Sequence, residues 1–296
     1  MFISSKYQYH LLAILVIIVW GTTFVSTKVL IGQGLSPIEI MVYRFLIAYA
    51  CIWIVCPRKL FAQNIKDELL CIGAGLAGGS LYFLFENTAL GITLASNVSL
   101  IICTAPIFTA FVQRLIYRKE KIKNHLIIGS LIALVGVACV VFNGSFILKI
   151  SPLGDILTIL AALSWAFYGS ILKELNKRYS TLFVTRKTFF YGILTILPFS
   201  FFGNNTFNTH LLTTPTILLN LLFLGVVASL LCYVMWNNAI KALGVVQTSN
   251  YIYLIPLITL ITSALVINER VTYIALIGSV FILLGVYIAE KGFGKK

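Results

Sequence analysis

The sequence predicts an all-α membrane protein of ten transmembrane helices. Three observations lead to this fold class: the composition, the length of the apolar stretches, and a pattern that occurs twice along the chain. Of the 296 residues, 59% are hydrophobic and only 10% are charged, whereas soluble domains are about 45–50% apolar and about 25% charged. A soluble fold needs a polar outer shell that this chain cannot supply. A lipid bilayer removes that need.

Ten apolar stretches are each predicted to form one transmembrane helix, because each approaches the roughly 20 residues that cross a bilayer. In the first half they run over residues 11–31, 37–56, 69–91, 93–117 and 125–142. In the second half they run over residues 153–173, 182–202, 216–239, 246–267 and 271–289. These spans leave only short connectors, so no additional soluble domain is predicted. The first stretch is too long for the core of a cleavable signal peptide and is predicted to be retained.

The basic residues predict the orientation of the bundle. With the N-terminus placed in the cytoplasm, fifteen of the 22 lysines and arginines fall in cytoplasmic segments, and only Lys149 and Arg270 fall in the opposite loops. The other five lie within spans. Such an asymmetry is typical of the positive-inside rule and predicts that both termini are cytoplasmic. The net charge of +13 is therefore interpreted as a topology signal and not as evidence for a nucleic-acid partner.

The two halves of the chain share one pattern. The segment A-L-G-I-T-L-A-S-N at 89–97 corresponds to A-L-G-V-V-Q-T-S-N at 242–250, and each is followed by a proline in the middle of a span, Pro106 or Pro256. The further matches are Trp20 with Trp165, Gly129 with Gly278, and Gly136 with Gly285. We expect one five-helix repeat over 1–145, a second over 150–291, and a basic tail over 292–296.

An odd number of spans in each copy places the second copy upside down relative to the first. Inverted repeats of this kind are related by an axis in the membrane plane, and in many transporters the substrate site lies near the midplane between them. The predicted fold is therefore two inverted five-helix repeats around a central cavity. The symmetry supplies two nearly equivalent conformations, open to one side or to the other.

These features resemble the drug/metabolite transporter superfamily, specifically the EamA-type family of ten-helix proteins. The resemblance covers essentially the whole chain. It rests on Trp20-Gly21, on the two Ala-Leu-Gly…Ser-Asn segments, and on the duplicated proline and glycine series. It implies a cavity lined by helices 1, 3, 4, 6, 8 and 9, with helices 5 and 10 toward the periphery. It also implies export of amino acids, other metabolites or amphipathic compounds across a bacterial inner membrane.

Aromatic residues recur on the helices that the resemblance assigns to the cavity. Their faces suit amphipathic or cationic ligands, although any single one is more often part of a core or of an interface belt. Two or three of them are expected to contact substrate. The candidates are Trp20, Tyr82, Trp165, Tyr168, Trp236, Tyr251 and Tyr253, and Thr23 is added to the candidate substrate-binding residues.

Glu86 is the most informative acidic residue, because it falls in the outer half of the third span. An ionisable side chain at such a depth costs about 2.5–3.5 kcal/mol on insertion scales and usually faces a cavity or a partner. Lys28 and Arg44 are predicted at similar depths on helices 1 and 2. Two hypotheses stay open for Glu86: an ion pair that holds these helices together, or a substrate or proton site. Alternatively, the Lys28 side chain extends outward to the membrane surface. The side chains of Arg186 and Lys187 are expected to extend inward, toward the cytoplasmic surface.

Asn97, Asn250, Pro106 and Pro256 mark the fourth and ninth spans. The asparagines are candidates either for bridging neighbouring helices or for direct substrate contact. The prolines remove a backbone donor in mid-helix and are expected to kink both spans. They act either as static bends or as hinge and cavity-lining residues.

Several kinds of chemistry are disfavoured. The G-x-G-x-x-G match at 73–78 lies inside an apolar span without the strand–turn–helix context of a dinucleotide site, and no Walker A motif is present. The histidines and cysteines show no metal-ligand spacing, so neither a metal nor a cofactor is expected.

A secondary exporter that works by alternating access is the leading hypothesis, acting as a monomer or homodimer rather than as an enzyme. The alternatives are a membrane-embedded enzyme acting on lipid-linked substrates, an exchanger of nucleotide sugars, and a structural or sensory scaffold.

Overall fold

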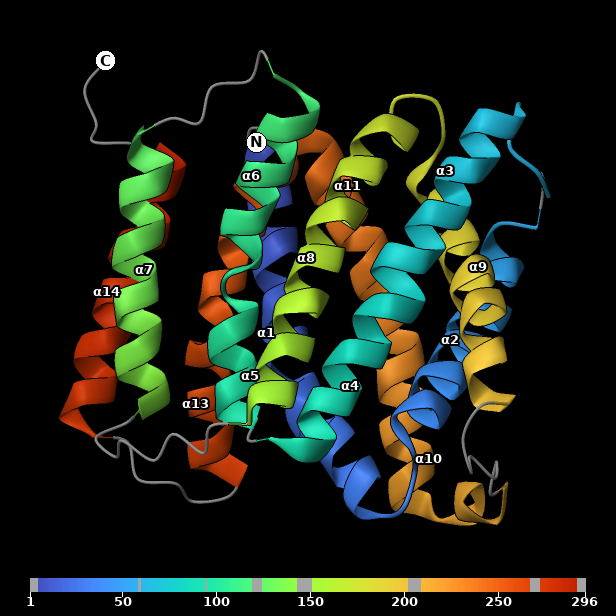
Figure 1. The fold of residues 1–296 in the computed structure, drawn as a ribbon, viewed down its shortest axis with the longest axis horizontal. Coiled ribbons are helices and arrows are strands. Elements are labelled where there is room, and N and C mark those ends of the chain that lie inside the picture. The colour runs from blue at the N-terminus through green and yellow to red at the C-terminus, as the bar shows by residue number, and fades with distance from the viewer. Residues whose placement is uncertain are drawn as a thin grey trace.

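The computed structural model describes residues 5–57, 60–93, 95–118, 124–142, 151–201, 209–266 and 272–291. Within these residues every regular element is a helix, and the helices form one bundle (Figure 1). Among the described residues, nine helical stretches are long and apolar enough to cross a membrane, and Tyr273–Ala289 is a shorter apolar helix. The structure confirms the predicted all-α fold with ten helices.

Each half of the chain contributes five spans, several of them built from more than one element. The first five are α1 (Ser5–Gly32), α2 (Pro37–Val55), α3 (Ile65–Gly75) with η1 (Leu76–Leu81) and α4 (Tyr82–Ile92), α5 (Ala95–Ile102) with α6 (Ala105–Ile116), and α7 (Asn124–Phe142). The second five are α8 (Pro152–Leu175), α9 (Thr181–Phe201), α10 (Pro215–Leu222) with η3 (Phe223–Leu231) and α11 (Cys232–Leu243), α12 (Val245–Ser249) with η4 (Asn250–Leu254) and α13 (Ile255–Val266), and α14 (Tyr273–Lys291). A short 3₁₀ turn, η2 (Thr209–Thr213), precedes α10.

Local signals explain how some of these helices begin. Before α2, the Ser36 hydroxyl accepts a hydrogen bond from the Glu39 amide at 3.2 Å, and the Glu39 carboxylate accepts one from the Ser36 amide at 2.8 Å. This reciprocal pair is a capping box, which satisfies two backbone donors at the helix start. Gly34 and Gly244 have positive φ angles of 97° and 93° at the sharp turns after α1 and after α11, where a side chain would be strained.

The third span of each half contains a π-helical segment, η1 in one half and η3 in the other. Such segments disturb the regular helical hydrogen-bond ladder and are frequent at functional sites. Carbonyls in both accept hydrogen bonds from aromatic side chains. The Tyr233 hydroxyl donates to the Gly78 carbonyl at 2.6 Å, and the Trp20 indole donates to the Ala228 carbonyl at 3.0 Å. These contacts connect the irregular backbone of each half to side chains of the other.

The fourth span of each half is interrupted just before its proline. Residues 103–104 separate α5 from α6, and the 3₁₀ segment η4 separates α12 from α13. Pro106 and Pro256 are the second residues of α6 and α13. The irregular backbone of both spans therefore lies just before the proline. Each proline lies in the first turn of a new segment, where its missing N–H is not needed.

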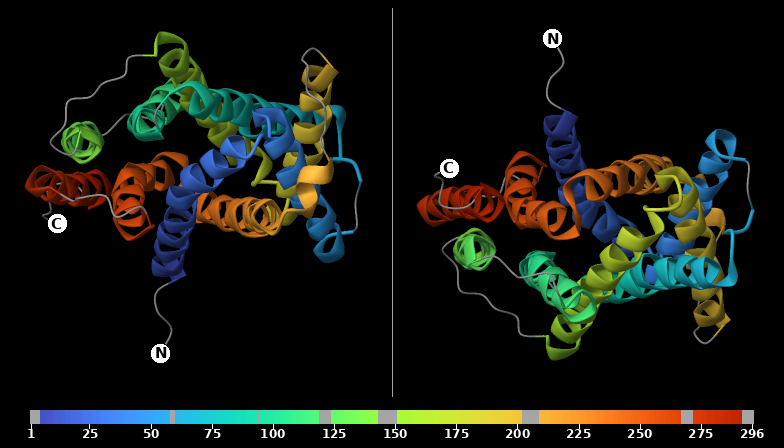
Figure 2. Two further views of the ribbon diagram at one scale, coloured as in Figure 1. Left: turned by 90° about the horizontal axis from the view of Figure 1, so that it is seen from below. Right: turned by 90° about the horizontal axis from the view of Figure 1, so that it is seen from above.

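The last helices of the two halves, α7 and α14, pack against each other along their glycines. A Cβ atom on Gly136 would lie 2.5 Å from the Gly278 carbonyl oxygen, and one on Gly285 would lie 2.6 Å from the Gly129 carbonyl oxygen. Matched glycines of the two halves therefore face each other in antiparallel order, as inverted copies require. Figures 1 and 2 place this pair at one margin of the bundle, in agreement with the expected peripheral position.

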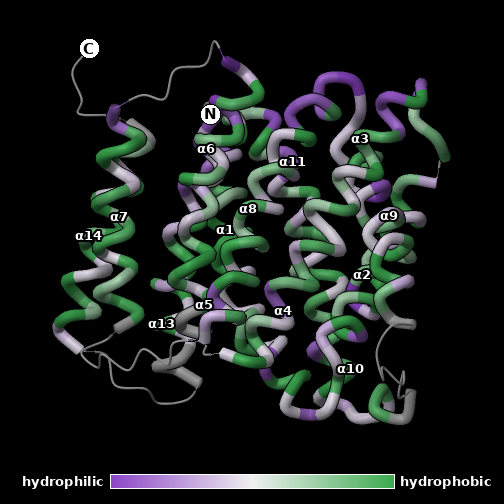
Figure 3. Tube along the Cα trace, viewed as in Figure 1, coloured by the Kyte–Doolittle hydropathy of each residue, from purple (hydrophilic) through white to green (hydrophobic). Residues whose placement is uncertain are grey.

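Hydrophobic residues dominate the middle of the helices, and hydrophilic residues gather mainly at the end of the bundle where α1 begins (Figure 3). Two cations depart from this arrangement. Arg186 and Lys187 are only 2% and 3% exposed, and both reach partners at helix ends, at the end of α2 and the start of α3. Lys187 forms an ion pair with Glu68 of α3, and Arg186 donates a hydrogen bond to the carbonyl of Cys56. Both charges therefore have partners inside the bundle.

Candidate functional site

Six aromatic side chains from both halves meet in the interior, and we call them the central aromatic cluster: Trp20, Tyr82, Trp165, Tyr168, Tyr233 and Trp236. The Trp20 ring centroid lies 5.3 Å from that of Trp165, edge to face, and 5.0 Å from that of Trp236. The Tyr82 and Trp165 centroids are 5.0 Å apart. These separations are typical of favourable aromatic pairs. The matched tryptophans of the two halves thus contact each other directly.

A cavity of about 40 Å³ adjoins this cluster, and we call it the central cavity. Its walls are mainly apolar and come from the first, second, third and fourth spans of one half and the first, third and fourth of the other. Besides Trp20, Tyr82, Trp165 and Tyr233, it is lined by Thr23, Phe24, Arg44, Phe83, Glu86, Ile102, Ala105, Ile252 and Ile255. All six spans that the family resemblance assigns to the cavity contribute to these walls, and α2 contributes as a seventh through Arg44.

Arg44 and Glu86 place one positive and one negative charge on this cavity. Arg44 donates through Nε to the Ser229 hydroxyl at 3.0 Å, and its guanidinium carbon lies 4.2 Å from the centre of the Phe83 ring. Glu86 accepts a hydrogen bond from the Tyr82 hydroxyl at 2.9 Å. Among the described residues, no ion pair within 4.0 Å joins Arg44 to Glu86. The geometry therefore does not favour the hypothesis that Glu86 serves only as a structural ion pair.

The structure brings together some of the predicted site residues and separates others. Thr23 reaches the central cavity, although its hydroxyl donates to the Trp20 carbonyl at 2.7 Å. Asn250 is buried, its side-chain nitrogen has no hydrogen-bond partner among the described residues, and it does not line the cavity. Tyr253 is also buried and packs in a separate cluster with residues of α7 and α14. The side chain of Asn97 lies outside the described part of the structure.

The two remaining expectations concern Tyr251 and Lys28. The Tyr251 hydroxyl forms a hydrogen bond with Nδ1 of His10 at 2.6 Å, away from the central aromatic cluster. Lys28 is exposed, and its Nζ donates to the Thr93 carbonyl at 3.3 Å, near the ends of α1 and α4. Lys28 therefore extends to the surface instead of pairing with Glu86.

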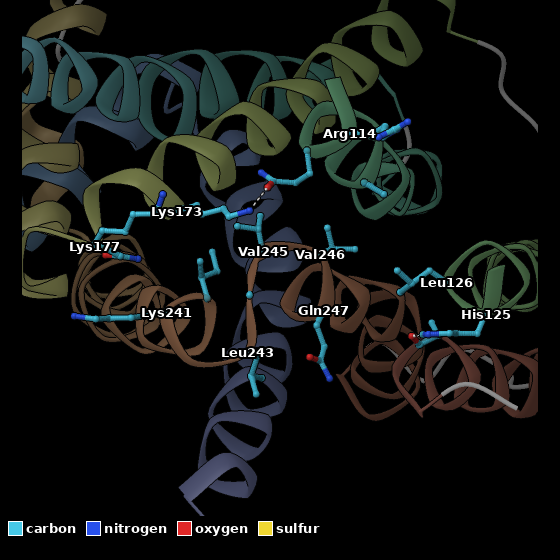
Figure 4. A pocket seen from close by; sticks show the side chains of 16 residues that line it. Arg114, His125, Leu126, Lys173, Lys177, Lys241, Leu243, Val245, Val246 and Gln247 are labelled. Carbon is cyan, nitrogen blue, oxygen red and sulfur yellow. Dashed lines mark hydrogen bonds between the residues drawn. The ribbon is translucent and has the colours of Figure 1, made fainter. Parts of the chain in front are cut away.

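A much larger cavity, of about 800 Å³, opens between the ends of α6, α7, α8, α11 and α14, and we call it the basic vestibule. Its cations are Arg114, Lys173, Lys177 and Lys241 (Figure 4). Lys173 donates to the Gln113 side chain at 3.2 Å. No aspartate or glutamate is among the described residues that line it. The helix ends that line the vestibule lie at the end of the bundle where α14 ends and where hydrophilic residues gather (Figures 1 and 3).

Ten apolar helices in two matched halves around a buried aromatic cavity define a polytopic membrane protein, and the comparisons with known proteins identify a transporter rather than an enzyme. The profile of the EamA-like transporter family matches residues 8–142 and, a second time, residues 152–290. The chain belongs to this family. Within the described residues, no group of three or more His, Cys, Asp or Glu side chains is arranged to hold a metal ion.

Curated relatives of similar length support this assignment. An uncharacterized transporter of Archaeoglobus fulgidus is 27% identical over 283 residues, which cover 94% of this chain and 96% of that protein. A probable amino-acid metabolite efflux pump of Escherichia coli is 26% identical over 288 residues, which cover 95% and 94%. One of Salmonella typhimurium with the same description is 28% identical over 294 residues, which cover 95% and 94%. A crystal structure with 17% sequence identity and a TM-score of 0.74 covers 96% of both chains, which shows a shared fold.

Proposed function

We propose that the chain is a secondary transporter of the bacterial inner membrane that exports amino acids or other small amphipathic metabolites by alternating access. The observation that carries this proposal is a buried cavity walled by both inverted halves, combined with a wide vestibule at one end of the bundle. The two relatives described as probable amino-acid metabolite efflux pumps support the substrate class. The basic residues favour an orientation in which the vestibule and both termini face the cytoplasm.

Movement of the helices is part of this proposal, because the central cavity is far smaller than the vestibule. A volume of about 40 Å³ accommodates about three water molecules, given that one water occupies roughly 10–15 Å³ on this measure. A larger solute enters only if the surrounding helices separate. The interrupted fourth and ninth spans supply places for such movement, since their helical ladders are already broken before Pro106 and Pro256. Their equivalence in the two halves supports opening toward either side.

A nucleotide sugar is less well supported as the substrate. Its diphosphate would need several cationic groups, whereas Arg44 is the one cation among the described residues that line the central cavity. Glu86 on the same wall would repel a diphosphate. The charge of the site therefore favours small solutes with little or no net charge.

Transport into inside-out membrane vesicles tests the function directly. Vesicles that contain the protein should accumulate amino acids from a metabolite panel faster than vesicles that lack it, and a proton gradient should increase the rate if Glu86 carries the coupling proton. Glu86→Gln should then remove the effect of the gradient, while Lys28→Gln, which alters a surface cation, should keep it. Failure to transport any member of the panel would reject the proposed function. An unchanged pH dependence in Glu86→Gln would reject proton coupling at that residue.

A further inference from the structure

The central cavity contains one positive and one negative charge that, among the described residues, form no ion pair within 4.0 Å. Arg44 is 2% exposed and Glu86 is 7% exposed. Among the described residues neither has an ion-pair partner within 4.0 Å, in contrast to Lys187, which is paired with Glu68. A buried charge without a charged partner is costly, most of all within a bilayer. Arg44 and Glu86 attract each other without direct contact, so an occupant of the cavity would give each of them a contacting counter-charge.

The Arg44 guanidinium is positioned to bind a carboxylate. Its Nε donates to the Ser229 hydroxyl, and its plane lies near the Phe83 ring, so two contacts fix its orientation. No hydrogen bond to another described residue occupies its two terminal nitrogens. A guanidinium held in this way presents paired donors whose spacing matches the two oxygens of a carboxylate.

The Glu86 carboxylate is positioned to bind an ammonium group. Tyr82 donates its hydroxyl to one oxygen, Oε1, and thereby orients the side chain. The second oxygen receives no hydrogen bond from the described residues, and a carboxylate accepts several. Because Tyr82 and Glu86 are four residues apart on α4, they share one face of that helix, and both line the cavity.

The balance of charge then selects the class of ligand. One cation and one anion make the wall neutral as a whole, so a ligand with one carboxylate and one ammonium leaves every charge paired. An amine alone would leave Arg44 without a partner, and an acid alone would leave Glu86 without one. Trp20, Trp165 and Tyr233 form the adjoining wall and offer apolar surface to a hydrophobic side chain.

We infer that the central cavity recognises a zwitterion, with the ligand carboxylate on Arg44, its ammonium on Glu86 and its apolar side chain on the central aromatic cluster. This inference rests on the proposed transport function and narrows its substrate class to neutral amino acids with hydrophobic side chains. It excludes monocations, carboxylic acids without an amine, and dianions as preferred ligands. The ligand binds once the helices around the cavity have moved apart.

Binding of matched probes to the purified full-length protein tests the inference. Three of the four tryptophans belong to the central aromatic cluster, so quenching of intrinsic fluorescence reports on occupation of the cavity. The probes are leucine and phenylalanine, their decarboxylated amines (isopentylamine and phenethylamine), and their deaminated acids (4-methylpentanoate and 3-phenylpropanoate). We expect each amino acid to bind at least tenfold more tightly than its amine or its acid.

Variants test which residue binds the carboxylate of the ligand and which binds its ammonium group. In Arg44→Gln the amino acid should lose its advantage over the amine, and in Glu86→Gln it should lose its advantage over the acid. Arg44→Lys should keep part of the preference for a carboxylate, and Lys28→Gln should bind like the wild type. If the wild-type protein binds the singly charged probes as tightly as the amino acids, or binds none of the six, the inference is overturned. Because these are binding measurements, that result differs from failure of the proposed function, in which no panel compound is transported.

Discussion

Two pairs of buried charged side chains in the described part of the bundle differ in their partners. Lys187 on α9 pairs with Glu68 on α3, and the Tyr191 hydroxyl donates to the same carboxylate. These contacts satisfy the charges within the protein and connect a helix of one half to a helix of the other. Arg44 and Glu86 instead face the central cavity, where they attract each other but form no ion pair within 4.0 Å. We interpret the first pair as structural and the second as ligand-binding.

Removal of the Glu68 charge should destabilise the fold. Glu68→Gln leaves the buried Lys187 ammonium without its counter-charge, and breaking one partner of a buried pair typically costs about 3–5 kcal/mol. Thermal unfolding in detergent should show a clear fall in Tm. Lys177→Gln is the matched control, because it breaks an ion pair with Glu174 whose lysine is 56% exposed, and exposed pairs contribute about 0–1 kcal/mol. Equal Tm changes for the two variants would contradict the structural role.

The sequence indicated the aromatic and acidic members of the site more readily than the basic one. Tyr233 was not among the candidates, although it lies three residues before Trp236 and therefore on the same helix face. The sequence places the Arg44 charge within the second span but does not show that it faces the cavity, because a uniformly apolar helix does not reveal which of its faces points into the bundle. Tyr253 was expected at the cavity, but it lies in η4. A 3₁₀ segment turns 120° per residue instead of 100°, so its side chains point differently.

At the scale of elements, hydropathy predicted the number and order of the spans but not their internal breaks. The third span begins at Ile65 in the structure, four residues before the predicted start, because the acidic residues Asp67 and Glu68 are buried through hydrogen bonds and ion pairs. The π-helical segments η1 and η3 leave no distinct hydrophobic periodicity within a continuous apolar stretch, so the sequence does not reveal them. Their positions depend on tertiary contacts such as the hydrogen bond from Trp20 to the Ala228 carbonyl.

The close approach of α7 and α14 gives a prediction at this scale. In Gly136→Ala the new Cβ would lie 2.5 Å from the Gly278 carbonyl oxygen, so the two backbones must separate. Overpacking of this kind typically costs about 1–3 kcal/mol, and Tm should fall accordingly. Gly91→Ala is the control, because nothing lies within 4 Å of a Cβ atom at that position. A Tm for Gly136→Ala that matches the control would show that the glycine contact is dispensable.

At the scale of the whole molecule, equivalent features occur at equivalent places in the two halves. Each half has a π-helical segment in its third span, a break before the proline of its fourth, and a glycine-lined fifth helix that packs on its counterpart. The two halves differ in the charged side chains that they place on the central cavity, since Arg44 and Glu86 both belong to the first half. This combination supports a symmetric opening movement around an asymmetric binding site.

Accessibility of the central cavity from the two membrane faces tests alternating access most directly. In a chain whose six native cysteines are replaced, Thr23→Cys places a thiol on the central cavity and Gln247→Cys places one on the basic vestibule. Membrane-impermeant thiol reagents are then applied to right-side-out and inside-out vesicles. The account predicts that Thr23→Cys reacts from both faces, with a balance that shifts when leucine is added, and that Gln247→Cys reacts from the cytoplasmic face alone. Reaction of Thr23→Cys from one face only, with and without leucine, would contradict it.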